Sequence, residues 1–89
     1  MFHNAADVIR MKGENVYSVY FLTDGREMIV SLTLKDSEAM LTKFGFFRVH
    51  KSFIVNLKYV VRYIKGEGGF VVMTDGSEVE VSRRNNQIF

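Results

Sequence analysis

The chain has 89 residues, of which 47% are hydrophobic and 13% aromatic, and its formal net charge at pH 7 is +2. This composition is that of a folded globular domain rather than a disordered segment. The lack of cysteine excludes a disulfide scaffold and a thiolate zinc site, and the presence of only two histidines, His3 and His50, argues against a histidine metal site. We therefore expect one domain over residues 1–89, without metal or cofactor.

The sequence shows no signal for a membrane or an export pathway. No apolar stretch approaches the ~20 residues of a membrane span. The first residues lack the basic and apolar regions of a signal peptide. We expect a cytoplasmic protein that makes no membrane contact through this chain.

Short runs of alternating apolar and polar residues, separated by glycine-containing turns, predict a mainly β domain. Loops are expected at Lys12–Asn15 and at Gly66–Gly69. The expected strands are Val8–Lys12, Val16–Leu22, Glu27–Ser31, Phe46–Val49, Val60–Lys65, Phe70–Met73 and Glu78–Val81.

Two Asp-Gly pairs, Asp24-Gly25 and Asp75-Gly76, are typical of two-residue hairpin turns. This role accounts for both aspartates without any chemistry. The sequences around them, residues 23–31 and 74–82, parallel each other from the turn to a final serine. The parallel fits either a shared turn chemistry or a true internal repeat.

One short helix is expected between the third and fourth strands. Thr33 or Ser31 can cap its start, and Phe44-Gly45 ends it. Its expected apolar face consists of Leu34, Ala39, Met40 and Leu41.

Basic residues are unevenly distributed along the chain. Residues 39–66 contain six lysines and arginines and no acid, which predicts a local positive patch that attracts polyanions. A second short helix is expected over residues 83–89, after a cap at Ser82. Arg83 and Arg84 would lie in its first turn, where cations are unfavourable, and this indicates an anionic partner.

No motif for enzyme chemistry is present, and we expect no enzymatic activity. Ser52 lies close to His50 in sequence, but residues 39–66 contain no acid to orient the imidazole. Gly66–Gly69 lacks the lysine and the following helix of a nucleotide-binding loop.

The segment that follows the helix carries a dense set of hydrogen-bond donors. Arg48 and Lys51 can neutralise phosphates or bind guanine in the major groove, and His50 can bond a base edge. Asn56, in an apolar run, is expected to bond the local backbone instead. The core candidates of this segment are Phe47, Val49, Phe53 and Val55.

This segment resembles the signature of the LytTR-type DNA-binding domain of bacterial transcription regulators. The resemblance extends over about residues 7–89, because Asp7-Val8-Ile9 and Val81-Ser82-Arg83-Arg84 resemble the opening and the close of the family pattern. The signature run is Phe47-Arg48-Val49-His50-Lys51-Ser52-Phe53-Ile54-Val55-Asn56.

The resemblance implies an almost all-β fold of short antiparallel strands in small stacked sheets, with one short intervening helix and a short C-terminal helix. It also implies sequence-specific binding of double-stranded DNA, as the output domain of a bacterial response regulator. By this resemblance and the charge pattern, the expected DNA-binding residues are Asn15, Tyr17, Ser18, Arg48, His50, Lys51, Arg83 and Arg84.

Family members bind DNA as homodimers or as pairs on direct repeats, and they usually carry a receiver or sensor domain as well. Relatives have an additional strand or hairpin before the position of Asp7, where this sequence has six residues. We therefore expect a trimmed first hairpin, or a first strand whose free edge pairs with another copy. The alternative functions are a small β protein-interaction module and an RNA-binding module.

Overall fold

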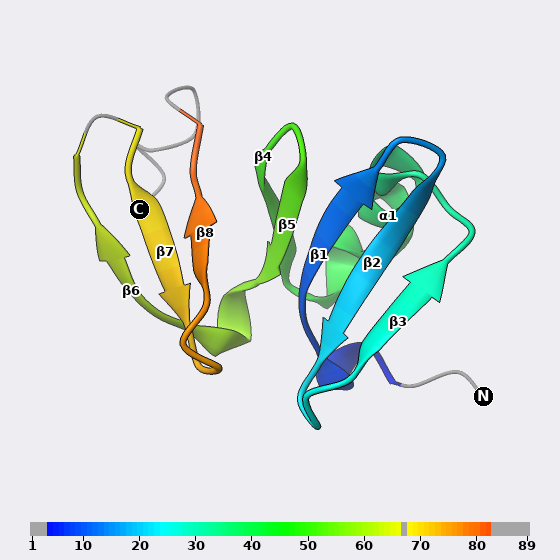
Figure 1. The fold of residues 1–89 in the computed structure, drawn as a ribbon, viewed down its shortest axis with the longest axis horizontal. Helices are drawn as coiled ribbons and strands as arrows, with labels where there is room; N and C mark the ends of the chain where they lie inside the picture. The colour runs from blue at the N-terminus through cyan, green and yellow to red at the C-terminus, as the bar shows by residue number, and fades with distance from the viewer. Residues whose placement is uncertain (1–3, 67, 83–89) are drawn as a thin grey trace.

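The computed structural model describes residues 4–66 and 68–82. This described part is mainly β, as expected, with one α-helix and three 3-10 turns, η1 to η3 (Figure 1). The second helix, expected over residues 83–89, lies outside the described residues. In chain order the elements are η1 (Ala5–Asp7), β1 (Val8–Glu14), β2 (Tyr17–Leu22), β3 (Glu27–Val30), α1 (Leu34–Leu41), η2 (Thr42–Phe44), β4 (Phe46–His50), β5 (Phe53–Asn56), η3 (Leu57–Tyr59), β6 (Val60–Ile64), β7 (Phe70–Met73) and β8 (Glu78–Glu80).

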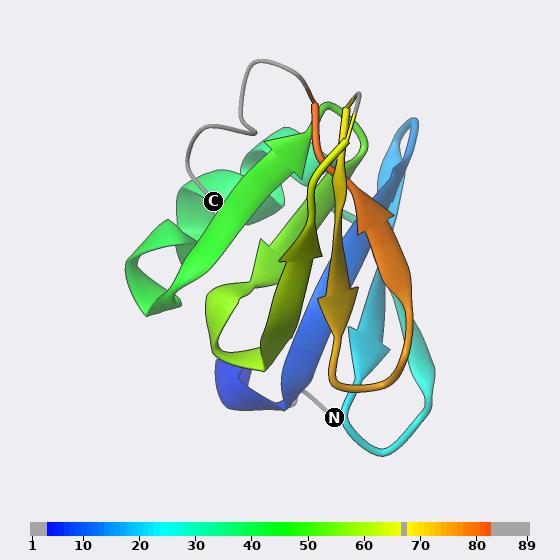
Figure 2. The same cartoon turned by 90° about the vertical axis from the view of Figure 1, so that its left-hand side faces the viewer.

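The described elements form three layers. A five-stranded antiparallel sheet with the order β3-β2-β1-β5-β4 lies between α1 on one face and a three-stranded sheet, β6-β7-β8, on the other. Figure 2 shows the smaller sheet in front of the larger one. This arrangement confirms the expectation of small stacked antiparallel sheets.

Each face of the central sheet has its own hydrophobic core, because successive side chains of a strand point to opposite faces. Along β1, Val8 packs toward α1 and the next residue, Ile9, packs toward the smaller sheet. The core beneath α1 consists of Val8, Met11, Tyr20, Leu22, Leu34, Leu41, Phe46 and Ile54. The core between the sheets consists of Ile9, Val49, Val55, Val71, Met73, Val79 and Val81.

The seven expected strands are all present, but two details differ. Strand β5 was not expected as a separate strand, because the turn that joins it to β4, Lys51-Ser52, contains no glycine, asparagine or aspartate to mark it. The expected loop at Lys12–Asn15 is mostly strand. β1 continues to Glu14, and Asn15 makes the turn with a positive φ of 65°, which asparagine tolerates.

The first strand has no free edge. β1 pairs with β2 on one side and with β5 on the other. The expectation that its edge would pair with another copy is therefore wrong. Sequence reasoning assumed that the first strand lies at the edge of a sheet, whereas β5 returns from later in the chain to cover it.

Helix α1 begins where expected, but its α-helical part ends at Leu41, before the expected end at Phe44-Gly45. The Thr33 side chain accepts a hydrogen bond from the Asp36 backbone N–H, so Thr33 rather than Ser31 is the cap. At the other end, η2 continues the helix to Gly45, whose φ of 88° reverses the chain.

The buried face of α1 differs from the expected one. Ala39 and Met40 are exposed, whereas Ser37 is buried because its hydroxyl forms a 2.6 Å hydrogen bond with that of Tyr20. Because its hydroxyl is hydrogen-bonded, Ser37 can be buried on a helix face where a hydrophobicity pattern predicts only apolar residues. The residues that α1 buries are Leu34, Ser37 and Leu41.

The two Asp-Gly hairpins have the same geometry, which is not that of a two-residue turn. In the first, Leu22 accepts from Gly25 and donates to Arg26, so the turn holds three residues. Only the glycine has a positive φ, 89° at Gly25 and 86° at Gly76. Such a turn needs left-handed backbone at one position only.

The likeness between the two hairpins extends to the elements before them. In each unit a 3-10 turn leads into a bulged strand, and a hairpin follows. Thr23 donates to the carbonyl of Asp7 at the end of η1, and Thr74 donates to Tyr59 at the end of η3, each at 2.9 Å. The structure therefore favours a true repeat, η1-β1-β2-β3 and η3-β6-β7-β8, over shared turn chemistry alone.

Candidate nucleic-acid interface

Four connections lie side by side along one edge of the molecule, which we call the rim (top of Figures 1 and 2). Both Asp-Gly turns lie at the opposite edge (bottom of the same views), away from the rim. The rim consists of the β1–β2 turn (Asn15 and Val16), the β4–β5 turn (Lys51 and Ser52), the end of β8 (Val81 and Ser82) and the β6–β7 loop (Lys65, Gly66, Gly68 and Gly69).

Backbone hydrogen bonds tie these connections to one another. Each bond joins two segments that are distant in sequence, so the rim is a fixed row rather than four independent loops. The bonds run from Gly13 N–H to the Ser52 carbonyl at 2.8 Å, from Ser82 N–H to the Val49 carbonyl at 2.8 Å, and from Val81 N–H to the Gly69 carbonyl at 3.1 Å.

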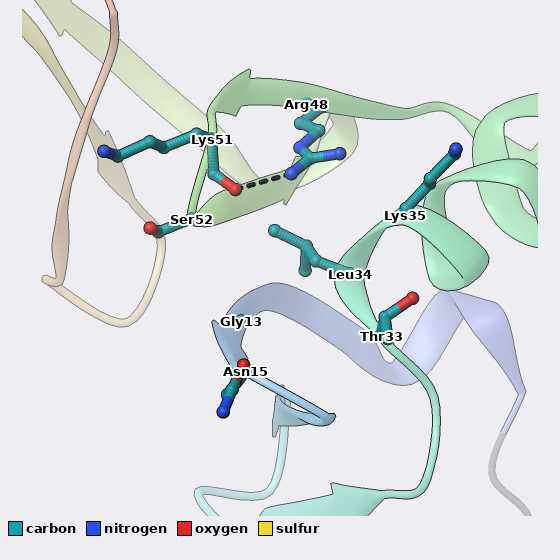
Figure 3. Close-up of a pocket in the computed structure, with 8 residues that line it drawn as sticks. All are labelled: Gly13, Asn15, Thr33, Leu34, Lys35, Arg48, Lys51 and Ser52. Carbon is teal, nitrogen blue, oxygen red and sulfur yellow. Dashed lines mark hydrogen bonds between the residues drawn. The ribbon is translucent and has the colours of Figure 1, made fainter.

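Arg48 organises the β4–β5 turn from inside it. Its guanidinium donates to the Lys51 carbonyl at 2.6 Å and lies 3.4 Å from the His50 carbonyl, and it pairs with the Glu38 carboxylate at 3.3 Å. Figure 3 shows the guanidinium pointing back toward the Lys51 carbonyl. The geometry of Arg48 is that of a residue that positions the turn.

His50 is held in one orientation at the end of β4. Its Nδ1 accepts the Ser52 backbone N–H at 3.0 Å, and its ring lies 5.0 Å from that of Phe53. Because Nδ1 accepts, neutral His50 carries its proton on Nε2. That nitrogen lies 3.8 Å from a carboxylate oxygen of Glu80 and is the donor that an incoming base edge could use.

Lys51 is exposed at the tip of the turn. Figure 3 shows its ammonium pointing away from Arg48, on the far side of the turn from α1. Beneath the turn lies a hollow of about 270 Å³, between the β1–β2 turn and the start of α1. Its lining residues are Gly13, Asn15, Thr33, Leu34, Lys35, Arg48, Lys51 and Ser52.

The β1–β2 turn presents two of its three expected contact residues. Asn15 is exposed, and Tyr17 is 38% exposed. Ser18 is buried, and its hydroxyl donates to the Leu32 carbonyl at 2.8 Å, where it fastens the segment that leads into α1. A side chain in that position has no surface with which to meet DNA. Arg83 and Arg84 lie outside the described residues.

The acid-free segment does not form a single patch. Lys51 lies on the rim, whereas Lys58 lies in η3, at the other end of β5. Glu38 and Glu80, which come from outside the segment, pair with Arg48 and approach His50. Sequence reasoning missed these two acids because linear charge counting contains no information about which strands and helices become neighbours.

The groups whose pKa shifts lie away from the rim. Burial lowers the pKa of Arg10, whose guanidinium lies 3.6 Å from the centre of the Phe21 ring, while the charge of Asp75 opposes this effect. Burial alone would raise the pKa of Asp75. Hydrogen bonds from Ser77 and the charge of Arg10 together outweigh this effect, so the pKa of Asp75 is lowered. These shifts belong to the packing of the β7–β8 hairpin against β1.

Asn56 has the structural role expected for it. It is 2% exposed, its amide donates to the Val8 carbonyl at 2.9 Å, and its oxygen accepts the Lys58 backbone N–H. The core candidates of the signature run also lie where expected. Val49 and Val55 are fully buried, and Phe47 and Phe53 pack against the core between the sheets.

Within the described residues, no helix is long and apolar enough to span a membrane.

Comparison with known proteins gives two curated relatives, the heme-containing CO-sensing transcriptional regulators RcoM 1 and RcoM 2 of Paraburkholderia xenovorans (strain LB400). Each is 34% identical to this chain over 76 residues, which cover 84% of it. The chain spans only 28% of the length of these relatives.

A solved structure has the same fold. It is the LytTr DNA-binding domain of a putative methyl-accepting/DNA response regulator from Bacillus cereus, with a TM-score of 0.82 and 22% identity, over 94% of this chain and 78% of that one. The sequence also matches the LytTR family, described as the LytTr DNA-binding domain, over residues 1–89. The chain therefore belongs to the LytTR family of DNA-binding domains.

Proposed function

We propose that this domain binds double-stranded DNA sequence-specifically through its rim, as the output domain of a bacterial transcription regulator. The observation that carries the proposal is the hydrogen-bonded row of connections, which presents Asn15, His50 and Lys51 along one edge. The relatives support it, since they are named as transcriptional regulators and a DNA response regulator.

The length of the rim suits a duplex. The molecule is 38 Å long, and in Figure 1 the β1–β2 turn and the β6–β7 loop lie near opposite ends of this axis. One helical turn of duplex DNA is about 34–36 Å, so a molecule of this length can span about one turn and contact successive grooves on one side of the helix. The β4–β5 turn lies between them and can contact the intervening backbone or groove.

The proposed contacts divide into reading and positioning residues. Asn15 and His50 offer the donor and acceptor groups that distinguish base edges, and Lys51 offers a charge for phosphate or guanine. Of Arg83 and Arg84, consecutive residues that cannot both occupy one groove position, we assign a base contact to Arg84 and a phosphate to Arg83. Arg48 contributes indirectly, because it holds the β4–β5 turn that carries Lys51 in place.

Single-stranded RNA is a weaker candidate than duplex DNA. Binding of single strands relies on neighbouring exposed aromatic rings on which bases stack. Among the described residues the exposed aromatics are Tyr17, at the rim, and Phe44, in η2 beyond the start of β4. Phe44 precedes β4 at the end of that strand away from the rim, so the two rings do not form one stacking surface at the rim.

The domain is further proposed to act in the cytoplasm, without catalysis, and to bind as a homodimer or in pairs on direct repeats. The curated relatives, of which this chain spans 28%, are named as heme-containing and CO-sensing. Oligomeric state on DNA is measured by analytical ultracentrifugation with duplexes that carry one or two sites.

The test begins with selection of bound duplexes from a random pool, which yields a cognate site. Alanine variants of His50, Lys51, Arg83 and Arg84 are then titrated on cognate and random duplex at two salt concentrations. Replacement of a base-reading residue should cost ~1–3 kcal/mol of binding free energy on the cognate site and little on random DNA. Replacement of a phosphate contact should weaken binding to both DNAs and lower the salt slope by about one unit.

Equal losses on both DNAs for all four variants would show that these residues read no bases, and specificity would then come from DNA deformability. A flat salt response of the unmodified domain, or tighter binding to single-stranded RNA than to duplex, would refute the proposal itself.

A further inference from the structure

We propose that strand β3 associates with a second copy of this chain, through antiparallel pairing of the two β3 strands about a two-fold axis at Ile29. The pairing itself does not depend on DNA binding. Its consequence, that the dimer joins two duplexes, rests on the proposed function, because it requires the rim of each copy.

Strand β3 lies at an edge of the five-stranded sheet, where β2 is its only described neighbour. Leu22 N–H donates to the Arg26 carbonyl at 2.9 Å, where the β2–β3 hairpin closes. Hydrogen-bonded pairs alternate along an antiparallel ladder, so Met28 also bonds to β2. Glu27 and Ile29 therefore turn their backbone N–H and C=O groups away from β2. A row of such groups at a sheet edge is a template for one more strand.

A large apolar side chain occupies the middle of this open edge. Ile29 is 71% exposed and lies opposite Val19 of β2. The alternate residues, Met28 and Val30, pack against the core beneath α1. A second β3 beside the first would extend the row of Val19 and Ile29 into the same two residues of the copy. Apolar pairs that lie directly opposite each other stabilise antiparallel strands.

The other described sheet edges carry features that hinder such pairing. β6 has a bulge at its start and an exposed Arg62. β8 is three residues long and presents Glu78 and Glu80, and in β4 the Val49 carbonyl already accepts from Ser82. β3 pairs with β2 without a bulge, and its four residues include no lysine, arginine or proline. Bulges, charges and short length are the usual protection of an edge, so β3 is the least protected of the described edges.

Side-chain chemistry selects the register of the pairing. A two-fold axis at Glu27 would place two carboxylates opposite each other, which is destabilising. An axis at Met28 would place the Glu27 carboxylate opposite Ile29 of the copy. An axis at Ile29 places the two isoleucines opposite each other and Glu27 opposite Ser31. Because the backbone groups of Ile29 face outward, its two copies then exchange both N–H···O=C bonds.

The antiparallel pairing turns the second copy end for end. The rim lies beyond the end of β3 (top of Figure 1), so the two rims of the dimer face opposite ends. One straight duplex cannot contact both rims, and the dimer therefore holds one duplex at each end. Pairing of copies on direct repeats of a single duplex needs another surface. The interface is one pair of short strands, which places it among small, transient contacts.

Disulfide trapping tests the pairing, and the chain has no cysteine of its own to interfere. Ile29→Cys places two thiols across a hydrogen-bonded pair with a Cα separation of about 5.5 Å, within the ~4.4–6.8 Å that a disulfide spans. In a glutathione redox buffer without DNA, this variant should form a disulfide-linked dimer. The control is Val61→Cys in the edge strand β6, which is 58% exposed and should stay monomeric. Glu27→Cys mixed with Ser31→Cys should give mixed dimers that neither variant gives alone.

Sedimentation equilibrium of cysteine-free chains measures the association without trapping. Ile29→Lys should weaken it about tenfold, because two ammonium groups then lie opposite each other. Val61→Lys should leave it unchanged. Equal trapping of Ile29→Cys and Val61→Cys, or an unchanged association of Ile29→Lys, would overturn the inference.

The trapped Ile29→Cys dimer then tests the consequence for DNA. Beads that carry the selected duplex should retain a second, fluorescent copy of that duplex when the trapped dimer is added. A dimer that places both copies on one duplex overturns the end-for-end arrangement. A dimer that forms but binds no duplex overturns the proposed function and leaves the pairing intact. No dimer, with DNA binding by the monomer intact, overturns this inference alone.

Discussion

Replacement of Arg48 by alanine should destabilise the domain, because this side chain holds the β4–β5 turn. Its 2.6 Å bond to the Lys51 carbonyl is a charge-assisted hydrogen bond, a class worth roughly 1.5–3 kcal/mol. The contacts to His50 and Glu38 are longer, 3.4 and 3.3 Å, and the ion pair is partly exposed, so they add less than about 1 kcal/mol. With the turn partly solvated, we expect a total loss of about 1–2 kcal/mol.

Thermal and urea unfolding followed by circular dichroism measures this loss. For a domain of this size, about 1–2 kcal/mol corresponds to a fall in Tm of roughly 5–15 °C. The control is Glu38→Gln, which removes only the partly exposed ion pair and should change the unfolding free energy by less than about 0.5 kcal/mol. Hydrogen exchange at the Ser52 amide, which donates to His50 Nδ1, should accelerate in Arg48→Ala and not in the control.

The DNA-binding behaviour of the same variant separates positioning from direct contact. A residue that acts through the turn should weaken cognate binding while leaving the salt slope within about half a unit of that of the unmodified domain. Lys51→Ala should lower the slope by about one unit. If Arg48→Ala kept full stability and lowered the slope by a full unit, Arg48 would be a phosphate contact and the reasoning from its geometry would be refuted.

Three further predictions concern the body of the domain. Tyr20→Phe leaves the buried Ser37 hydroxyl without its partner and should lower the unfolding free energy in urea by ~1–2 kcal/mol. The pKa of Asp75 is lowered in the folded state, so its stabilising contribution is present above the ordinary value near 3.9 and lost as pH falls through the lowered pKa. Asp75→Asn should therefore be less stable than the unmodified domain at neutral pH, with the difference shrinking as the pH falls below about 4, and a constant gap would contradict this. Asp24→Asn, at the edge opposite the rim, should bind DNA within a few fold of the unmodified domain, and a collapse of affinity with the fold intact would reveal a missed site.

Local sequence signals predicted most of the secondary structure, because each has a local cause. Thr33 caps α1, Gly45 ends it with a positive φ, and each Asp-Gly pair makes a hairpin. Strand β5 was not predicted because the turn before it, Lys51-Ser52, contains no glycine, asparagine or aspartate to mark it. The burial of Ser37 depends on the hydroxyl of Tyr20 in β2, which lies 17 residues away in sequence and is therefore invisible to a local pattern around the helix.

The candidate site was predictable in location but only partly in role. His50 lies at the end of β4 and Lys51 at the rim, and their contact with DNA stays a prediction, whereas Arg48 bonds backward into the turn and Ser18 is buried. These outcomes depend on long-range neighbours, such as the contact of Arg48 with Glu38 and the bond from Ser18 to the segment before α1. A pattern of residue types cannot distinguish a donor that faces solvent from one that bonds its own backbone.

The central claim, that the rim is the surface that meets duplex DNA, is tested most directly by a two-dimensional nitrogen–proton NMR titration of the domain with its selected duplex. Backbone amides at Asn15, Lys51 and Ser82 should shift or broaden in proportion to added DNA. The amides of Gly25 and Gly76, in the Asp-Gly turns at the opposite edge, should stay in place. Shifts concentrated at those two glycines, with the rim unchanged, would contradict the account.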